Sequence, residues 1–254
     1  YDGDVNVKNS KVFAGGKVGV ISTKNTNIEN SAIQANNKKD NPTSVHDVKI
    51  AGTNSVTIKN SAVDASGNVD IRSAYTDTKN LSGNINIITT KDAATHTLIS
   101  AGDKISIQGK NTLIDNSAFK YDELHFYNDG TNGLNNVTLK GDTQFTQKLA
   151  SGALSPDVIL ETNGNFTLDG ATVSAGDSSL TFIKNNNNFD YNVSLSPQTA
   201  DNIKITSTQG NVTATNKTNL NAKTDIDLIS KTGDVTVGNN TLITAGRDAN
   251  LTAQ

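Results

Sequence analysis

Cysteine is absent from this chain of 254 residues. Its absence excludes disulfide bonds and thiolate metal sites, and it suits a protein that is exported unfolded through an oxidising compartment. Apolar and aromatic residues are scarce as well, at 34% and 5% of the chain. A compact globular domain of this length would have a thin core, whereas alternating Val, Ile, Leu and Ala could fill the narrow interior of a solenoid.

Long apolar runs are also missing, and with them any expected membrane span in this segment. No signal peptide precedes Tyr1, so we expect the chain to be a fragment of a longer protein. The net charge of −3 is spread along the chain without a basic stripe, which argues against a nucleic-acid partner. No segment of helix length places apolar residues at i, i+3, i+4 and i+7, so strands should dominate.

Asparagine and threonine, with 35 and 32 copies, are the most frequent residues. Threonine favours strands, and asparagine tolerates the left-handed conformation of tight corners. The phrase Asn-Ser-x-apolar-x-Ala begins at Asn9, Asn30 and Asn60, with a weaker echo at Asn116. Related phrases end at Gly15, Gly67, Gly102, Gly176 and Gly246. This repetition predicts many short strands joined by sharp corners.

Short apolar-polar-apolar strands follow these phrases, for example Val69-Asp70-Ile71 and Leu180-Thr181-Phe182. Strands of this length cannot bury two faces in one flat sheet, so the chain should coil. We predict an all-β fold, a right-handed parallel β-helix of roughly twelve coils of about twenty residues, with irregular loops in the middle third. One repeat position should point inward and stack along the rod, and its predicted members are Val12, Val63, Leu98, Val173 and Leu242.

These phrases resemble the repeats of the filamentous haemagglutinin family, the two-partner-secretion exoproteins that include large adhesins and the stalks of contact-dependent growth-inhibition effectors. The resemblance covers residues 1–118 and about 200–254, and it is clearest from Asn60 to Ile71. It implies a β-helical filament that an outer-membrane partner secretes and that is displayed at the cell surface. Autotransporter passengers share the strand pattern, and an unrelated all-β protein with degenerate repeats is the alternative.

Residues 119–200 depart from the repeat, which divides the chain into regular coils at 1–118, an irregular segment at 119–200 and regular coils at 201–254. Nine of the twelve aromatic residues fall between Phe119 and Tyr191. Phe166 and Phe182 occupy strand positions where Val or Leu stand elsewhere, which indicates core packing. Four aromatic residues beside polar loops are instead predicted to form an exposed partner-binding patch: Tyr121, Tyr127, Phe189 and Tyr191.

No pattern points to catalysis, a cofactor or a metal, and none of the three is expected. The carboxylates Asp122, Glu123 and Asp129, or Asp225 and Asp227, could serve a glycosidase only if they faced each other across a bond, and surface placement fits them better. Arg72 and Arg247 lie beside turns and should be solvated. The three histidines, His46, His96 and His125, stand alone, and surface or edge positions suit them better than zinc.

Two classes of function remain. In the first, residues 119–200 bind a receptor on a host or neighbouring bacterial cell, as part of a secreted adhesive stalk. In the second, the chain is a passive spacer that carries a distal effector domain. A β-helical enzyme that degrades surface glycans is a minor third alternative.

Overall fold

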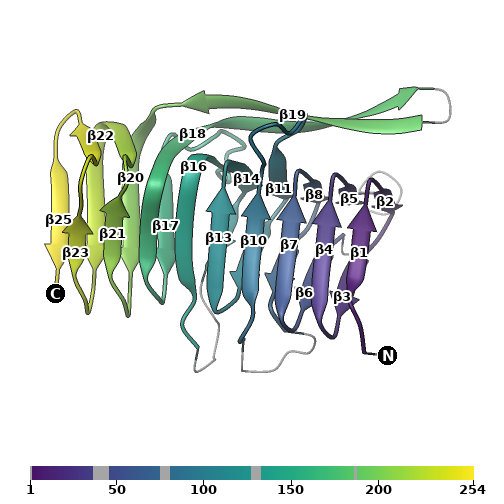
Figure 1. The fold of residues 1–254 in the computed structure, drawn as a ribbon. Coiled ribbons are helices and arrows are strands. Elements are labelled where there is room, and N and C mark those ends of the chain that lie inside the picture. The colour runs from purple at the N-terminus through teal and green to yellow at the C-terminus, as the bar shows by residue number, and fades with distance from the viewer. Residues whose placement is uncertain (1, 37–45, 75–80, 127–132, 186–187) are drawn as a thin grey trace.

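The computed structural model describes residues 2–36, 46–74, 81–126, 133–185 and 188–254, with side chains left out at 184–185 and 188–189. Every regular element in these ranges is a strand. The described residues contain no helix that is long and apolar enough to cross a membrane. The strands wind into a rod whose coils stack side by side (Figure 1). The predicted parallel β-helix is confirmed.

Each coil contributes to three faces, and corresponding strands pair in parallel from coil to coil. The first face is formed in order by β1 (Val5–Lys8), β4 (Asn25–Glu29), β7 (Ser55–Lys59), β10 (Asn84–Ile88), β13 (Asn111–Asp115), the beginnings of β16 (Asn136–Gln147) and β18 (Phe166–Asn185), β21 (Val212–Thr215) and β23 (Val235–Val237).

The second face is formed by β2 (Lys11–Ala14), β5 (Ala32–Ala35), β8 (Ala62–Ala65), β11 (Thr97–Ala101), β14 (Ser117–Tyr121), later parts of β16 and β18, the beginning of β22 (Asn219–Ser230) and β24 (Leu242–Ala245). The third face is formed by β3 (Val18–Ser22), β6 (Val48–Gly52), β9 (Val69–Arg72), β12 (Lys104–Gln108), β15 (Glu123–His125), β17 (Val158–Thr162), β20 (Ala200–Ser207), the end of β22 and β25 (Ala249–Ala253).

Coil length varies more than a twenty-residue repeat suggests. Stacked partners lie 21 residues apart at Asn6 and Asn27, 30 apart at Ser31 and Ser61, and 47 apart at Asp169 and Asn216. The described strands of the first face therefore trace nine coils. The longer coils carry their extra residues between paired strands, and the register is continuous except for shifts between Leu139 and Gly141 and between Ala200 and Asn202.

The Asn-Ser phrase marks the corner between the first and second faces. Asn9, Asn30, Asn60 and Asn116 all have φ between 47° and 49°, a left-handed conformation that asparagine adopts more readily than most residues. Gly141 takes the same role between the two halves of β16, with φ of 57°. The predicted function of these asparagines is confirmed, and it allows each coil to change direction within one or two residues.

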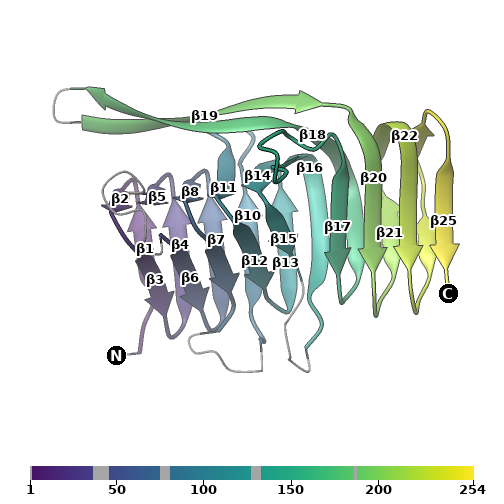
Figure 2. The same cartoon turned by 180° about the vertical axis from the view of Figure 1, so that it is seen from behind.

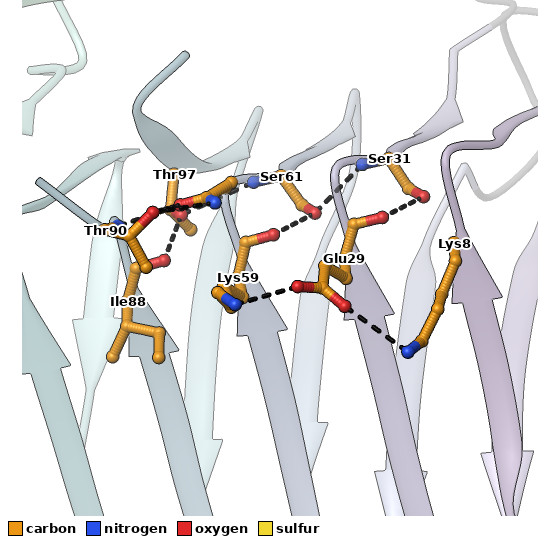
Figure 3. Close-up of polar contacts among 9 residues, drawn as sticks. Lys8, Glu29, Ser31, Lys59, Ser61, Ile88, Thr90 and Thr97 are labelled. Carbon is orange, nitrogen blue, oxygen red and sulfur yellow. Dashed lines mark hydrogen bonds and ion pairs between the residues drawn. The ribbon is translucent and has the colours of Figure 1, made fainter. Parts of the chain in front are cut away.

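The serine that follows each corner asparagine belongs to a ladder of hydroxyl groups (Figure 3). Ser61 Oγ donates to the Lys59 carbonyl over 2.6 Å and accepts from the Ser31 amide over 3.0 Å. Thr97 continues the ladder by donating to the Ile88 carbonyl over 2.6 Å. Each hydroxyl thus satisfies backbone groups that the corner removes from the strand ladder.

The interior is a stack of aliphatic and aromatic side chains. In the second face, the inward column contains Val12, Ile33, Val63, Ile99, Phe119 and Phe145, which are paired in register. The rings of Phe119 and Phe145 are stacked with centroids 5.4 Å apart. The predicted column is therefore right for Val12 and Val63. Val173 points inward as predicted, but it pairs with Thr143 and Leu220 and so stacks beside this column, two residues before the position that follows Phe145.

Two members of the predicted column were assigned wrongly. Leu242 is 58% exposed, and its neighbour Ile243 instead pairs with Leu220 and packs against the core. Leu98 pairs with Ala62, so it lies on the outer side of the second face although it is only 1% exposed. Both errors are one-residue slips, which reverse the side of the sheet on which a residue lies. Because Leu98 points away from the interior and is still buried, residues outside its own coil must pack over it.

Candidate functional site: the hairpin across the second face

An antiparallel hairpin, residues 175–198, projects from the rod and provides that cover. It joins the end of β18 to β19 (Asn188–Gln198), with Ala175 opposite Gln198 and Asn185 opposite Asn188. Figures 1 and 2 show it leaving the coils beside β20 and running back along the rod over β14, β11, β8, β5 and β2. The segment Leu180-Thr181-Phe182, predicted as a coil strand, is part of this hairpin.

Apolar contacts hold the hairpin on the second face. Ala62, Leu98 and Ala118 stack in register on the outer side of three successive coils, and Val193 of the hairpin buries itself against them. Three partly buried hairpin residues pack around this cluster: Leu180, Tyr191 and Leu195. Side chains alternate along β19, so Tyr191, Val193 and Leu195 face the coils. Asn192 and Ser194, between them, face the solvent.

Polar contacts pin the hairpin near its base. Lys120 of β14 donates to the Asp177 carboxylate and to the Ser178 carbonyl, both over 2.8 Å. Gln144 Nε2 donates to the Asp177 carbonyl over 2.7 Å. The hydrogen bond from Lys120 lowers the pKa of Asp177 below its usual value.

Contacts further along the hairpin reach the earliest coils. The Tyr191 hydroxyl donates to the carbonyl of Asn60, the corner residue of a coil 131 positions earlier, over 2.9 Å. The rings of Phe182 and Phe13 meet edge to face with centroids 4.9 Å apart. Since Phe13 belongs to the first coil, the hairpin bridges coils that are distant in sequence.

Of the four residues predicted to form an exposed aromatic patch, the two whose side chains are described, Tyr121 and Tyr191, are not exposed. Tyr121 is buried in the core of the second face, and burial raises the pKa of its hydroxyl. Tyr191 is half-buried on the side of the hairpin that packs on the coils, and burial, assisted by the charge of Asp190, raises its pKa to about 12. Phe189 lies on β19 opposite Lys184, with its side chain outside the described atoms, and Tyr127 lies outside the described residues.

The prediction of an exposed Tyr121 was wrong because the aromatic surplus has a packing role. Phe119, Phe126, Phe145 and Phe166 are fully buried, so rings fill the core of the middle coils where aliphatic side chains fill it elsewhere. Core packing is thus confirmed for Phe166, whereas Phe182 is half-buried on the hairpin. Sequence reasoning missed the hairpin, although two alternating stretches flanking the asparagine run 185–188 are a signal for one.

A groove lies where the hairpin joins the coils. This root groove encloses about 250 Å³ and is lined by Thr172, Val173, Ser174, Pro197, Gln198, Thr199, Asn219 and Asn221. Strands β18 and β22 supply its floor, with Thr172 paired to Asn219 and Val173 to Leu220. The chain at Pro197 and Gln198 supplies its wall. Gly176 permits this junction, since its φ is 136° and a Cβ atom would clash with the Ser196 carbonyl oxygen.

Most of the charged residues considered from sequence form ion pairs, while Asp227 accepts a hydrogen bond from the Asn250 side chain over 2.9 Å. Asp122 lies 3.1 Å from Lys148, and Arg247 holds Asp225 and lowers its pKa. Arg72 contacts Asp70 on the same strand and is largely buried, which corrects the prediction that it is solvated. Asp129 lies outside the described residues.

The three histidines occupy different environments. His46 is buried, contrary to the predicted surface position, while His96 is exposed and His125 lies 3.5 Å from Glu123. Within the described ranges, no three metal-ligating side chains come together.

Comparisons with known proteins found no match among family models, curated proteins or solved structures.

Proposed function

We propose that this chain is part of a secreted bacterial filamentous exoprotein, a β-helical stalk that binds a receptor on another cell through the hairpin and its surroundings. Export by an outer-membrane partner and display at the cell surface belong to the same proposal. Its support is the repeat phrasing together with a rod of stacked coils, since such a rod holds an attached surface at a distance from its base.

The observation that carries the proposal is the hairpin itself. Among the described strands, β18 and β19 form the long antiparallel pair, and this pair lies within the segment 119–200 where the repeat is lost. A stalk needs only uniform coils, whereas this hairpin adds an external ribbon with a polar outer side at Asn192 and Ser194. Elements set on a rigid scaffold in this way commonly carry binding functions.

A passive spacer is the second candidate, and one observation favours it. The apolar side of the hairpin is used inside the molecule, where Val193 packs on Leu98 and its neighbours. In that case the hairpin is a strap that stiffens the rod, and the exposed ribbon has no partner.

A hairpin-free variant separates the two candidates. Gly176 and Pro197 face each other across the ribbon, so residues 177–196 can be replaced by an Asn-Gly turn without a long gap to close. Leu98→Thr in the same variant removes the apolar side chain that the deletion uncovers. The matched control carries Leu98→Thr alone, with circular dichroism to confirm that both remain folded.

Binding of the labelled proteins to a panel of bacterial and mammalian cells is then measured. We expect the control to bind and the hairpin-free variant to lose at least about tenfold in affinity. Equal binding by both variants would show that the coils, and not the hairpin, bind the receptor. If the unmodified chain binds no cell, the spacer function is the one supported.

A further inference from the structure

We propose that the root groove binds one neutral sugar unit of a larger glycan. This inference rests on the proposed receptor-binding function and names the chemistry of the receptor. It arises from the side chains that line the groove, their lack of internal partners and the rigid strands on which they stand.

The groove is lined by uncharged polar residues together with the apolar Val173 and Pro197, and most of its exposed surface is apolar. Three amides, on Gln198, Asn219 and Asn221, face the same space as the hydroxyls of Thr172, Ser174 and Thr199. Amides and hydroxyls both donate and accept hydrogen bonds, which matches the hydroxyl groups of a sugar. Because the lining residues include no charged side chain, a charged ligand would exchange its hydration without gaining a counter-charge.

These amides differ from those of the asparagine ladder in the first face. Asn111 donates to Asn84 over 2.9 Å and Asn136 to Asn111 over 3.1 Å, so amides in the first face bond to one another. Asn219 instead stacks between Thr172 and Leu242. The side chains of Asn219, Asn221 and Gln198 form no hydrogen bond with any described part of the chain. Their donors and acceptors are therefore available to a ligand.

The groove is also pre-organised. Asn219 and Asn221 alternate with the buried Leu220 and Ala222 on β22, which fixes the direction in which their amides point. Pro197 adds a ring with a restricted backbone and an apolar face against which the C–H face of a pyranose can pack. A preformed site loses little entropy when a small ligand binds.

The size of the groove limits what it accommodates. A volume of about 250 Å³ is below that of pockets which enclose a drug-sized ligand, so a single sugar unit is the expected occupant. For a ligand of so few atoms we expect a dissociation constant of about 1 mM. Useful attachment would come from several copies on one cell surface.

The test is a titration of the ¹⁵N-labelled chain with methyl glycosides of glucose, galactose, mannose and N-acetylglucosamine, followed by NMR. We expect at least one glycoside to shift the side-chain amide signals of Gln198, Asn219 and Asn221. The methyl glycoside of sialic acid, which is negatively charged, should bind at least about tenfold more weakly than that neutral sugar. No shift with any neutral glycoside, or equal shifts far from the groove, would overturn the proposal.

Substitutions locate the effect. Asn219→Ala and Asn221→Ala should each weaken binding about fivefold, the loss expected from one hydrogen bond. Asn54→Ala is the matched control, because Asn54 is an exposed asparagine on a distant coil. An equal loss from all three variants would contradict a site in the groove.

The two proposals can fail separately. If cells bind the unmodified chain and the Asn219→Ala/Asn221→Ala double variant equally well, the glycan inference fails while receptor binding stands. If cells bind neither protein but a glycoside still occupies the groove, the receptor-binding function fails and the site remains.

Discussion

The coils and the hairpin are built from similar alternating sequences, yet they bury their side chains differently. In the coils, residues such as Ile58 and Ile71 lose all exposure, because neighbouring coils and the opposite faces enclose them. Beyond the base of the hairpin, Val193 is the one described apolar side chain that is buried, and Leu180 and Leu195 remain partly exposed. The difference shows that the coils carry the stability of the rod, whereas the hairpin is attached by one side.

This difference predicts two levels of stability within one molecule. Opening of the hairpin disrupts one small apolar cluster and a few polar contacts, while opening of a coil breaks the ladders of three faces. Regions that open at low cost are the ones suited to binding and rearrangement. The following substitutions test the two levels, from the largest expected effect to the smallest.

Removal of a ring from the middle coils should have the largest effect. Phe145→Ala deletes a fully buried side chain and leaves Phe119 without its stacking partner, so we expect a loss of about 3–5 kcal/mol in the free energy of unfolding. Urea unfolding followed by circular dichroism measures it. A loss below about 1 kcal/mol would mean that the middle coils are not closely packed.

Leu98→Ala should weaken the attachment of the hairpin. Leu98 is buried only by the hairpin cluster, so we expect a cost of about 2 kcal/mol that appears mainly as faster amide hydrogen exchange in residues 178–195. Leu251→Ala, at a side chain 52% exposed, is the control and should change little. Uniform loss of protection across the coils would show that hairpin and coils open as one unit.

The corner asparagines can be tested with a pair of substitutions at one position. Asn30 has φ of 48°, so Asn30→Ala should cost about 1–2 kcal/mol through the strained left-handed conformation. Asn30→Gly avoids that strain and should be nearly neutral. If thermal unfolding shows both to be equally destabilised, the side chain of Asn30 matters for a reason other than backbone conformation.

The hydroxyl ladder should contribute less at each step. Ser61→Ala removes a donor to the Lys59 carbonyl and an acceptor for the Ser31 amide, for which we expect about 1 kcal/mol. Ser10, at the exposed end of the ladder, makes the corresponding bond to the Lys8 carbonyl. Ser10→Ala should cost clearly less in chemical unfolding, and the reverse order would contradict a role for burial.

The ion pair at the base of the hairpin should have the smallest effect. The folded-state pKa of Asp177 is lowered, so its contribution is present above the ordinary value of 3.8 and disappears as the pH falls through the lowered pKa. Asp177 is exposed, and screening by water should keep the effect below about 0.5 kcal/mol. Asp177→Asn should therefore slightly increase hydrogen exchange of the hairpin at pH 7.

The same variant provides its own control at low pH. Once the pH has fallen well below the lowered pKa of Asp177, the unmodified carboxylate is protonated, and the difference between Asp177→Asn and the unmodified chain should vanish. A difference that persists there would show that the introduced amide disturbs the hairpin by some means other than loss of charge.

Local patterns were enough to predict the coils but not the hairpin. The left-handed corner at Asn60 and the inward position of Val63 follow from a short phrase, because each depends on residues within one coil. Leu180-Thr181-Phe182 has the same alternation as a coil strand, and only its antiparallel partner, Tyr191-Asn192-Val193, distinguishes it. Which partner a strand selects is a long-range property that alternation does not encode.

The candidate site shows the same limit. Clustering of aromatic residues correctly marked residues 119–200 as different, but the rings of Phe119 and Phe145 fill a core. The root groove brings Gln198 beside Asn219 and Asn221 through the junction of β19 with two coils. None of these residues belongs to a recognisable motif, so the groove could be found only from the structure.

The most direct test of receptor binding through the hairpin exploits the absence of cysteine. Thr181→Cys places a single thiol on the exposed side of the hairpin, and Glu161→Cys places one on the exposed third face. Each variant is coupled to a bulky maleimide-linked polymer, and its binding to cells is compared with that of the uncoupled protein. We predict that the polymer abolishes binding at position 181 and leaves it intact at position 161; intact binding at 181 would contradict a receptor contact at the hairpin.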